Sequence, residues 1–181
     1  MVAADQLRRV TGAAALLFLS GCLAASPFHV EAASTPDFHP EVFFLGVTRG
    51  EGTLVQHGKT DRKVHVIGVG RADRDGTLRL DQTVTYDDGT TEKRTWVLRH
   101  NGKQYVATLS DASGAVGGEA NGNVFRLRYL LRQPAVYMDQ ELYLQPDGRT
   151  VLNIATVSVL GVPWARLSER ITRPDSEPPV R

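Results

Sequence analysis

The sequence predicts an all-β fold, an antiparallel up-and-down meander of about eight to ten strands that closes into a barrel. Short segments alternate apolar and polar residues with a period of two, and turn-forming residues separate them at regular spacing. No long apolar stripe with helical spacing interrupts this pattern. Tight hairpins between sequential neighbours favour a meander, and closure removes the exposed sheet edges. A barrel of about eight strands can hold one small ligand.

The segment 77–86 is the clearest strand, because its residues fall into two alternating sets. The face that we expect to be buried carries Leu78, Leu80, Gln82, Val84 and Tyr86. A turn at 87–89 leads into the next strand, which presents Arg94, Trp96 and Leu98 on one face. Asn101-Gly102 then predicts a two-residue hairpin turn, because both residue types tolerate positive φ.

Further strands follow at similar spacing. Two of them carry the apolar sets Tyr105, Ala107, Leu109 and Phe125, Leu127, Tyr129, Leu131. The last three are expected over 136–144, 151–160 and 164–171, with turns at 133–134, 145–148 and 161–163. The outward positions are mostly Thr, Arg, Asp and Lys, so a water-soluble barrel fits better than a transmembrane barrel with an apolar outer band.

Residues 1–21 have the features of a signal peptide. Arg8 and Arg9 supply positive charge, and residues 10–19 form an apolar run shorter than the ~20 residues that span a bilayer. The sequence Leu-Ser-Gly-Cys at 19–22 resembles the lipobox of bacterial lipoproteins. That resemblance implies cleavage before Cys22 and acylation of its thiol. The alternative is an ordinary secretory signal with an unrelated cysteine.

We therefore expect a cell-envelope protein held to a membrane through Cys22. Two or three acyl chains anchor stably, since each buried CH₂ contributes ~0.8 kcal/mol. Leu23 follows the cysteine. In lipoproteins of two-membrane bacteria, Asp at this position favours retention in the inner membrane. We therefore expect this protein to be anchored in the outer membrane, facing the periplasm. Residues 22–42, with the acylated cysteine, are rich in Ala, Ser and Pro and predict a flexible tether. Residues 43–173 form the barrel domain, and 174–181 a disordered tail.

Composition excludes several classes of function. The chain has a single cysteine, so neither an internal disulfide nor a Cys-x-x-Cys pair can form. Its net charge is +1 and no basic block occurs, so no nucleic-acid partner is expected. His29 and His39 lack a third ligand at useful spacing, which argues against a metal site. No phosphate-binding glycine loop precedes a helix, and no cofactor is expected.

A resemblance to a known family covers most of 43–173. The opening segment 44–52 resembles the entry to lipocalin-like barrels. The pieces that match the family are 46–58, Tyr-Asp-Asp-Gly at 86–89, Arg94-x-Trp96, Asp111 followed by Gly114 and Gly118, Gly-Asn at 122–123, and Asn153 followed by Gly-Val at 161–162. In their order and spacing the chain resembles a family of uncharacterised proteobacterial lipoproteins, a domain of unknown function with a lipocalin-like (calycin-type) β-barrel. The resemblance implies a fold and an envelope location, without an established activity. The segment 137–141 departs from the family's pattern.

The candidate ligand-binding residues are Arg94, Trp96, Leu98, Gln82 and Leu80. An inward Arg94 would pair with a carboxylate or phosphate head group, with Gln82 as a second polar anchor and apolar residues covering the tail. The expected partner is thus a hydrophobic small molecule or lipid. In the alternative readings, Arg94 extends to water at the strand end, and Gln82 is a buried amide satisfied by the neighbouring backbone.

Two other functions stay open. A non-enzymatic envelope scaffold would have a filled barrel and an exposed apolar patch. An enzyme acting on a lipid or small apolar substrate would need a polar cluster in the cavity, with His65 or His100 as the obvious members beside Ser110-Asp111. No catalytic motif such as Gly-x-Ser-x-Gly or His-Glu-x-x-His is present, so we expect a protein without enzymatic activity.

Overall fold

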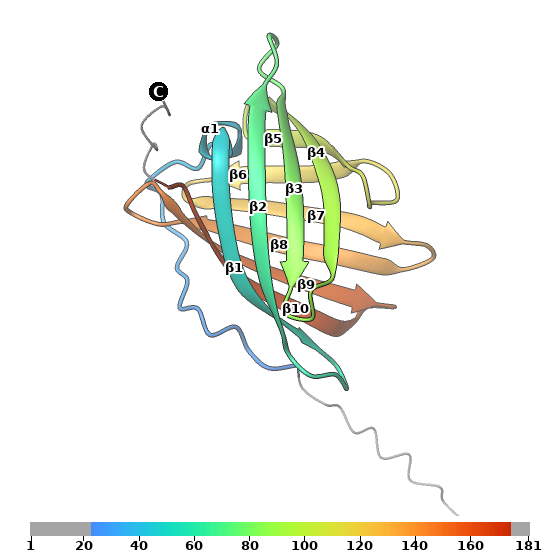
Figure 1. Ribbon diagram of the computed structural model, residues 1–181. Coiled ribbons are helices and arrows are strands. Elements are labelled where there is room, and N and C mark those ends of the chain that lie inside the picture. Colours follow the sequence, from blue (N-terminus) through green and yellow to red (C-terminus); the bar gives the residue numbers. More distant parts are fainter. Residues whose placement is uncertain (1–22, 175–181) are drawn as a thin grey trace, which may run out of the picture.

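The computed structural model describes residues 23–174, which form one short helix and ten strands (Figure 1). The signal peptide, Cys22 and residues 175–181 of the expected tail lie outside the described residues. The elements are α1 (Pro40–Phe43), β1 (Gly46–Gln56), β2 (Arg62–Ala72), β3 (Leu78–Tyr86), β4 (Thr91–Asn101), β5 (Gln104–Leu109), β6 (Val116–Asn121), β7 (Val124–Arg132), β8 (Val136–Leu144), β9 (Thr150–Val159) and β10 (Val162–Thr172).

The ten strands form a closed barrel in which every strand pairs with its sequential neighbours and β1 pairs with β10. All the pairings are antiparallel. The predicted all-β, up-and-down, calycin-type barrel is therefore confirmed. No helix of the described residues is long and apolar enough to cross a membrane.

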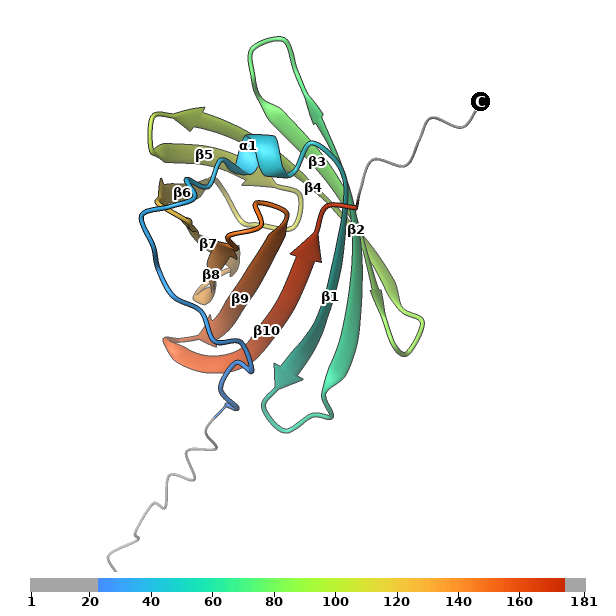
Figure 2. The same cartoon turned by 90° about the vertical axis from the view of Figure 1, so that its left-hand side faces the viewer.

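The two ends of the barrel differ in how well they are closed. The end near α1, called the closed end below, carries inward residues that are fully buried, such as Phe44, Leu98 and Ile171. The opposite end, called the mouth, is formed by the β1–β2, β3–β4, β5–β6, β7–β8 and β9–β10 connections (Figure 2). Leu54 and Met138, which line the mouth, are only half-buried. Solvent or a ligand therefore reaches the interior more easily from the mouth.

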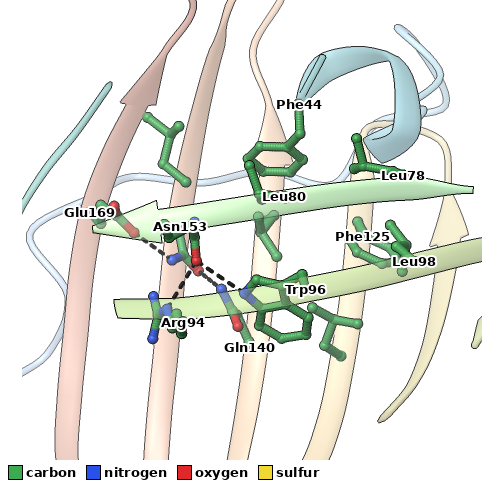
Figure 3. Close-up of a pocket in the computed structure, with 14 residues that line it drawn as sticks. Phe44, Leu78, Leu80, Arg94, Trp96, Leu98, Phe125, Gln140, Asn153 and Glu169 are labelled. Carbon is green, nitrogen blue, oxygen red and sulfur yellow. Dashed lines mark hydrogen bonds between the residues drawn. The ribbon is translucent and has the colours of Figure 1, made fainter. Parts of the chain in front are cut away.

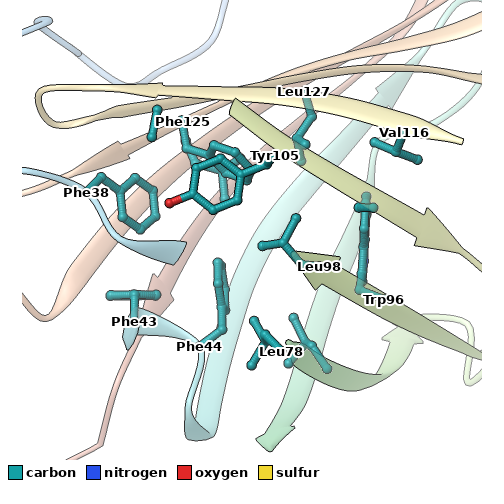
Figure 4. Packing of buried hydrophobic residues seen from close by; sticks show 14 of the residues in the cluster. Phe38, Phe43, Phe44, Leu78, Trp96, Leu98, Tyr105, Val116, Phe125 and Leu127 are labelled. Carbon is teal, nitrogen blue, oxygen red and sulfur yellow. The ribbon is translucent and has the colours of Figure 1, made fainter. Parts of the chain in front are cut away.

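Aromatic side chains fill the closed end (Figure 4). Phe38 packs edge-on against Phe43 and Phe125, with ring centroids 5.7 and 6.1 Å apart. Tyr105 packs against Phe125 at 5.0 Å, and its hydroxyl donates a hydrogen bond to Glu41 in α1. Such edge-to-face contacts add to the stabilisation from apolar burial. The core thus joins α1 and the segment before it to the barrel wall.

The segment before β1 differs from the expected flexible tether. Phe38 is 2% exposed, and its backbone N–H donates to the carbonyl of Gly122. Asn123, buried at the β6–β7 turn, accepts from the N–H of Ala33 and donates to the carbonyl of Glu31. The Ala, Ser and Pro content of the segment suits a tether, but its few large apolar residues supply enough burial to hold it against the barrel.

Candidate functional site

An internal pocket lies in the middle of the barrel, between the closed end and the mouth (Figure 3). All five sequence-predicted binding residues, Arg94, Trp96, Leu98, Gln82 and Leu80, line it. Further wall residues are Phe44, Leu78, Phe125, Leu127, Gln140, Leu142, Asn153, Glu169 and Ile171. The period-two alternation of β3 and β4 places the predicted side chains on the inner face. The wall is mostly apolar, with five polar side chains on one side.

The first polar group on this wall joins β3 and β4. Arg94 Nε donates to Gln82 Oε1 at 2.9 Å, and Trp96 Nε1 donates to the same oxygen at 3.0 Å. Gln82 and Arg94 are cross-strand partners, so the sheet register holds the two side chains together. Arg94 therefore points into the barrel rather than to bulk water, and Gln82 is satisfied by side chains rather than by backbone. The terminal nitrogens of Arg94 make no further hydrogen bond within the described residues.

The second polar group joins β8, β9 and β10. Gln140 Nε2 donates to Asn153 Oδ1 at 3.1 Å, and Asn153 Nδ2 donates to Glu169 Oε2 at 2.8 Å. Asn153 and Glu169 are 2% and 3% exposed. Burial raises the pKa of the Glu169 carboxyl, while the Asn153 hydrogen bond and the positive charge of Arg94 act in the opposite direction.

Glu169 fits inside the barrel because the neighbouring strand has no side chains there. Gly52 on β1 is its cross-strand partner, and Gly50 lies one inward position further along. A Cβ atom at Gly50 would overlap the carboxylate of Glu169, and one at Gly52 would approach the carbonyl oxygen of Ser168 to 2.7 Å. Atoms of β10 approach both positions so closely that only glycine fits there. The space that the two glycines leave lets a carboxyl group enter the core.

The free space in the pocket is small. The pocket holds about 530 Å³ of empty space, part of which is continuous with solvent, and only a small part of it is wide enough for water. That is room for a few water molecules. Ten strands enclose a wider interior than eight, and the aromatic side chains of the core occupy most of it. A larger ligand therefore requires side chains that line the pocket to move.

Sequence reasoning missed Glu169 and Gln140. Residues 165, 167, 169 and 171 alternate as Ala, Leu, Glu and Ile, so the period of two already placed Glu169 on an apolar face. Gln140 lies in the segment that departs from the family pattern. His65, His100 and Ser110 do not line the pocket, so the histidine-containing cluster considered for an enzyme is not formed there. No metal-binding group of three His, Cys, Asp or Glu side chains occurs within residues 23–174.

The raised pKa of Glu169 predicts a pH-dependent stability. The folded state holds the carboxyl proton to a higher pH than the unfolded chain, where the ordinary pKa of 4.5 applies. Folding stability from this group is therefore greatest below pH 4.5 and falls as the pH rises through the raised folded pKa. Glu169→Gln stays neutral at every pH, so its stability relative to the native protein should increase from pH 5 to pH 8.

Urea unfolding of both proteins at the two pH values measures this change. Glu119→Gln, on the exposed face of β6, is the matched control. The difference between its free energy of unfolding and that of the native protein should be the same at both pH values. If the stability difference between Glu169→Gln and the native protein were also the same at pH 5 and pH 8, the prediction of a raised Glu169 pKa would be wrong.

The fold and the pocket define a closed calycin-type barrel with an inward polar network. The chain belongs to the family DUF3833, described as a protein of unknown function, whose family model matches residues 16–173. No curated protein matches the chain.

Solved structures with the same fold are distant in sequence. The S-type phycobiliprotein lyase of Guillardia theta superposes with a TM-score of 0.60 at 10% identity, covering 77% of this chain and 95% of the lyase. A protein of unknown function from the DUF3598 family of Nostoc punctiforme gives a TM-score of 0.57 at 14% identity, covering 77% of this chain and 50% of that one. At these identities the likeness concerns the fold alone.

Proposed function

We propose that this protein is an envelope lipoprotein without enzymatic activity whose barrel binds a lipid-like amphiphile with an anionic head group. The observation that carries the proposal is Arg94, an inward arginine at the edge of an apolar wall, whose terminal nitrogens make no hydrogen bond to any residue of 23–174. A guanidinium with both terminal NH₂ groups free can hold a carboxylate or phosphate in a forked geometry. Anchoring through Cys22, in the outer membrane and facing the periplasm, belongs to the same proposal and depends on the sequence alone.

The side chains of the pocket assign the two ends of such a ligand. The head group would lie against Arg94, on the side where the network of Gln82, Gln140 and Asn153 supplies further polar atoms. The tail would lie against the aliphatic and aromatic wall that begins at Leu80. Because the pocket has room for only a few water molecules, the ligand must displace side chains as it enters, beginning with flexible ones such as Met138 at the mouth.

Native mass spectrometry with lipid extraction tests this function. The protein is expressed as residues 23–181 in a lipid-containing cell, so that any lipid found is bound and not attached to Cys22. This chain contains every strand of the closed barrel. We expect an acidic lipid to copurify at nearly one molecule per protein.

The second candidate function is a scaffold that presents its surface to another protein. The small free volume favours it, because a filled barrel needs no ligand. A folded protein that copurifies with no lipid, and that binds no member of a fatty-acid and phospholipid panel, would decide for the scaffold.

A further inference from the structure

The β9–β10 hairpin carries an exposed apolar tip. Its residues Leu160, Val162 and Trp164 are 75%, 66% and 36% exposed. They lie within five consecutive positions at the mouth of the barrel (Figure 2). Scattered exposed apolar residues are ordinary, but contiguous ones mark contact surfaces. These three residues are called the apolar tip below.

Leu160 is unfavourable for folding in two respects. It occupies the hairpin turn with φ of 51°, beside Gly161 with φ of 80°. Such turns favour Asn or Asp before the glycine, because positive φ crowds the side chain of other residues. The expected turn at 161–163 thus begins one residue earlier, and its first position holds a large apolar side chain in water. Neither the backbone conformation nor burial explains leucine at this position.

Cationic side chains flank the apolar tip. Lys59 of the β1–β2 turn places its Nζ 5.5 Å from the centroid of the Trp164 ring, and the N–H of His57 donates to the Trp164 carbonyl. On the other side, the N–H of Leu160 donates to the carbonyl of Ala135 in the β7–β8 turn, which follows the exposed Arg132. Asp61 in the β1–β2 connection is the nearest acidic residue along the chain to Lys59. Tryptophan beside a lysine, with a further basic residue on the same rim of the barrel, is typical of membrane–water interfaces.

The described chain begins on the same side of the molecule. Arg166, two residues after Trp164, donates from Nη1 to the carbonyl of Ala24 at 2.7 Å, and Ser168 bonds to Ser26. Figure 2 shows this start of the chain beside β10, at the end opposite α1. An anchor at Cys22 would therefore hold the mouth, rather than the closed end, toward the membrane.

We infer that the apolar tip is a membrane-docking surface that inserts into the interface of a lipid bilayer with Lys59 and Arg132 against its head groups. The inference goes beyond ligand binding and does not depend on the Arg94 pocket. It also gives the mouth an orientation. A lipid could then exchange between bilayer and barrel without crossing bulk water.

Cosedimentation with vesicles tests the inference. The probe is residues 23–181, which lack the anchor, mixed with phosphatidylcholine vesicles that contain a minority of phosphatidylglycerol. The tip variant combines Leu160→Asn, Val162→Thr and Trp164→Ser. We expect the native chain to bind at millimolar lipid and the tip variant to show a partition coefficient at least tenfold lower.

Two controls separate docking from folding. Leu160→Asn alone should leave the unfolding midpoint unchanged or raise it, since Asn tolerates the turn's positive φ. A matched variant with Val47→Thr, Ile67→Thr and Val106→Thr removes three exposed apolar side chains from the barrel wall and should bind vesicles like the native chain. Equal binding by the native chain and the tip variant, or no binding by the native chain, would overturn the inference. A native dimer that the tip variant converts to a monomer would also overturn it, in favour of a second copy.

Discussion

Phe38→Ala is expected to lower the free energy of unfolding by about 3–5 kcal/mol, the range for removing a large buried aromatic side chain. Phe38 is 2% exposed and contacts Phe43 and Phe125 at the closed end. Truncation would leave a cavity between α1 and the barrel wall, and the rings on both sides would lose contacts. Equilibrium unfolding in urea measures the loss.

The matched control is Val42→Ala, four residues further along the same segment. Val42 is 54% exposed, so its truncation should change stability by no more than about 0.5 kcal/mol. A loss below about 1 kcal/mol for Phe38→Ala would mean that the segment is a loosely held tether after all. A large loss would show that the chain before β1 is an integral part of the fold.

Arg94→Met should weaken the binding of a long-chain fatty acid by at least about tenfold, since a hydrogen bond to a charged group contributes about 1.5–3 kcal/mol. Methionine keeps much of the apolar volume of the side chain and removes the charge. The matching fatty alcohol, which has no negative charge, should bind the variant and the native protein equally. Isothermal titration with both ligands therefore separates loss of the head-group contact from damage to the pocket.

Two further variants sharpen this measurement. Arg99→Met lies on the same strand, but Arg99 points outward, where it pairs with Asp75 at 2.8 Å, so fatty-acid binding should not change. Arg94→Lys keeps the charge but not the planar fork, and should give an intermediate affinity. If the acid and the alcohol lost affinity to the same extent in Arg94→Met, Arg94 would have no role as the anchor.

The raised pKa of Glu169 bears on the same ligand. A carboxyl that keeps its proton to a higher pH carries less negative charge beside Arg94, so it competes less with an incoming anion for the guanidinium. The position of Glu169 opposite Gly52 therefore affects the charge that the proposed anionic ligand would meet in the pocket.

Local sequence pattern determined much of this barrel. The strands could be predicted because alternation with a period of two depends only on neighbouring residues. The same alternation put Arg94, Trp96 and Leu98 on one face, and the structure brings all three to the pocket wall. The family match covers the predicted domain as well, although it specifies no activity.

Only the tertiary structure decided the features that depend on residues far apart in the chain. Closure requires β1 to pair with β10, more than a hundred residues later, and that pairing brings Glu169 against Gly50 and Gly52. The packing of Phe38 on Phe125 depends on the same closed shape. Pocket volume also belongs to this group, because it is what remains after side chains from ten strands have packed. Alternation specifies which side of a strand a residue faces, whereas its distance from residues on other strands is set by how the whole sheet curves and closes.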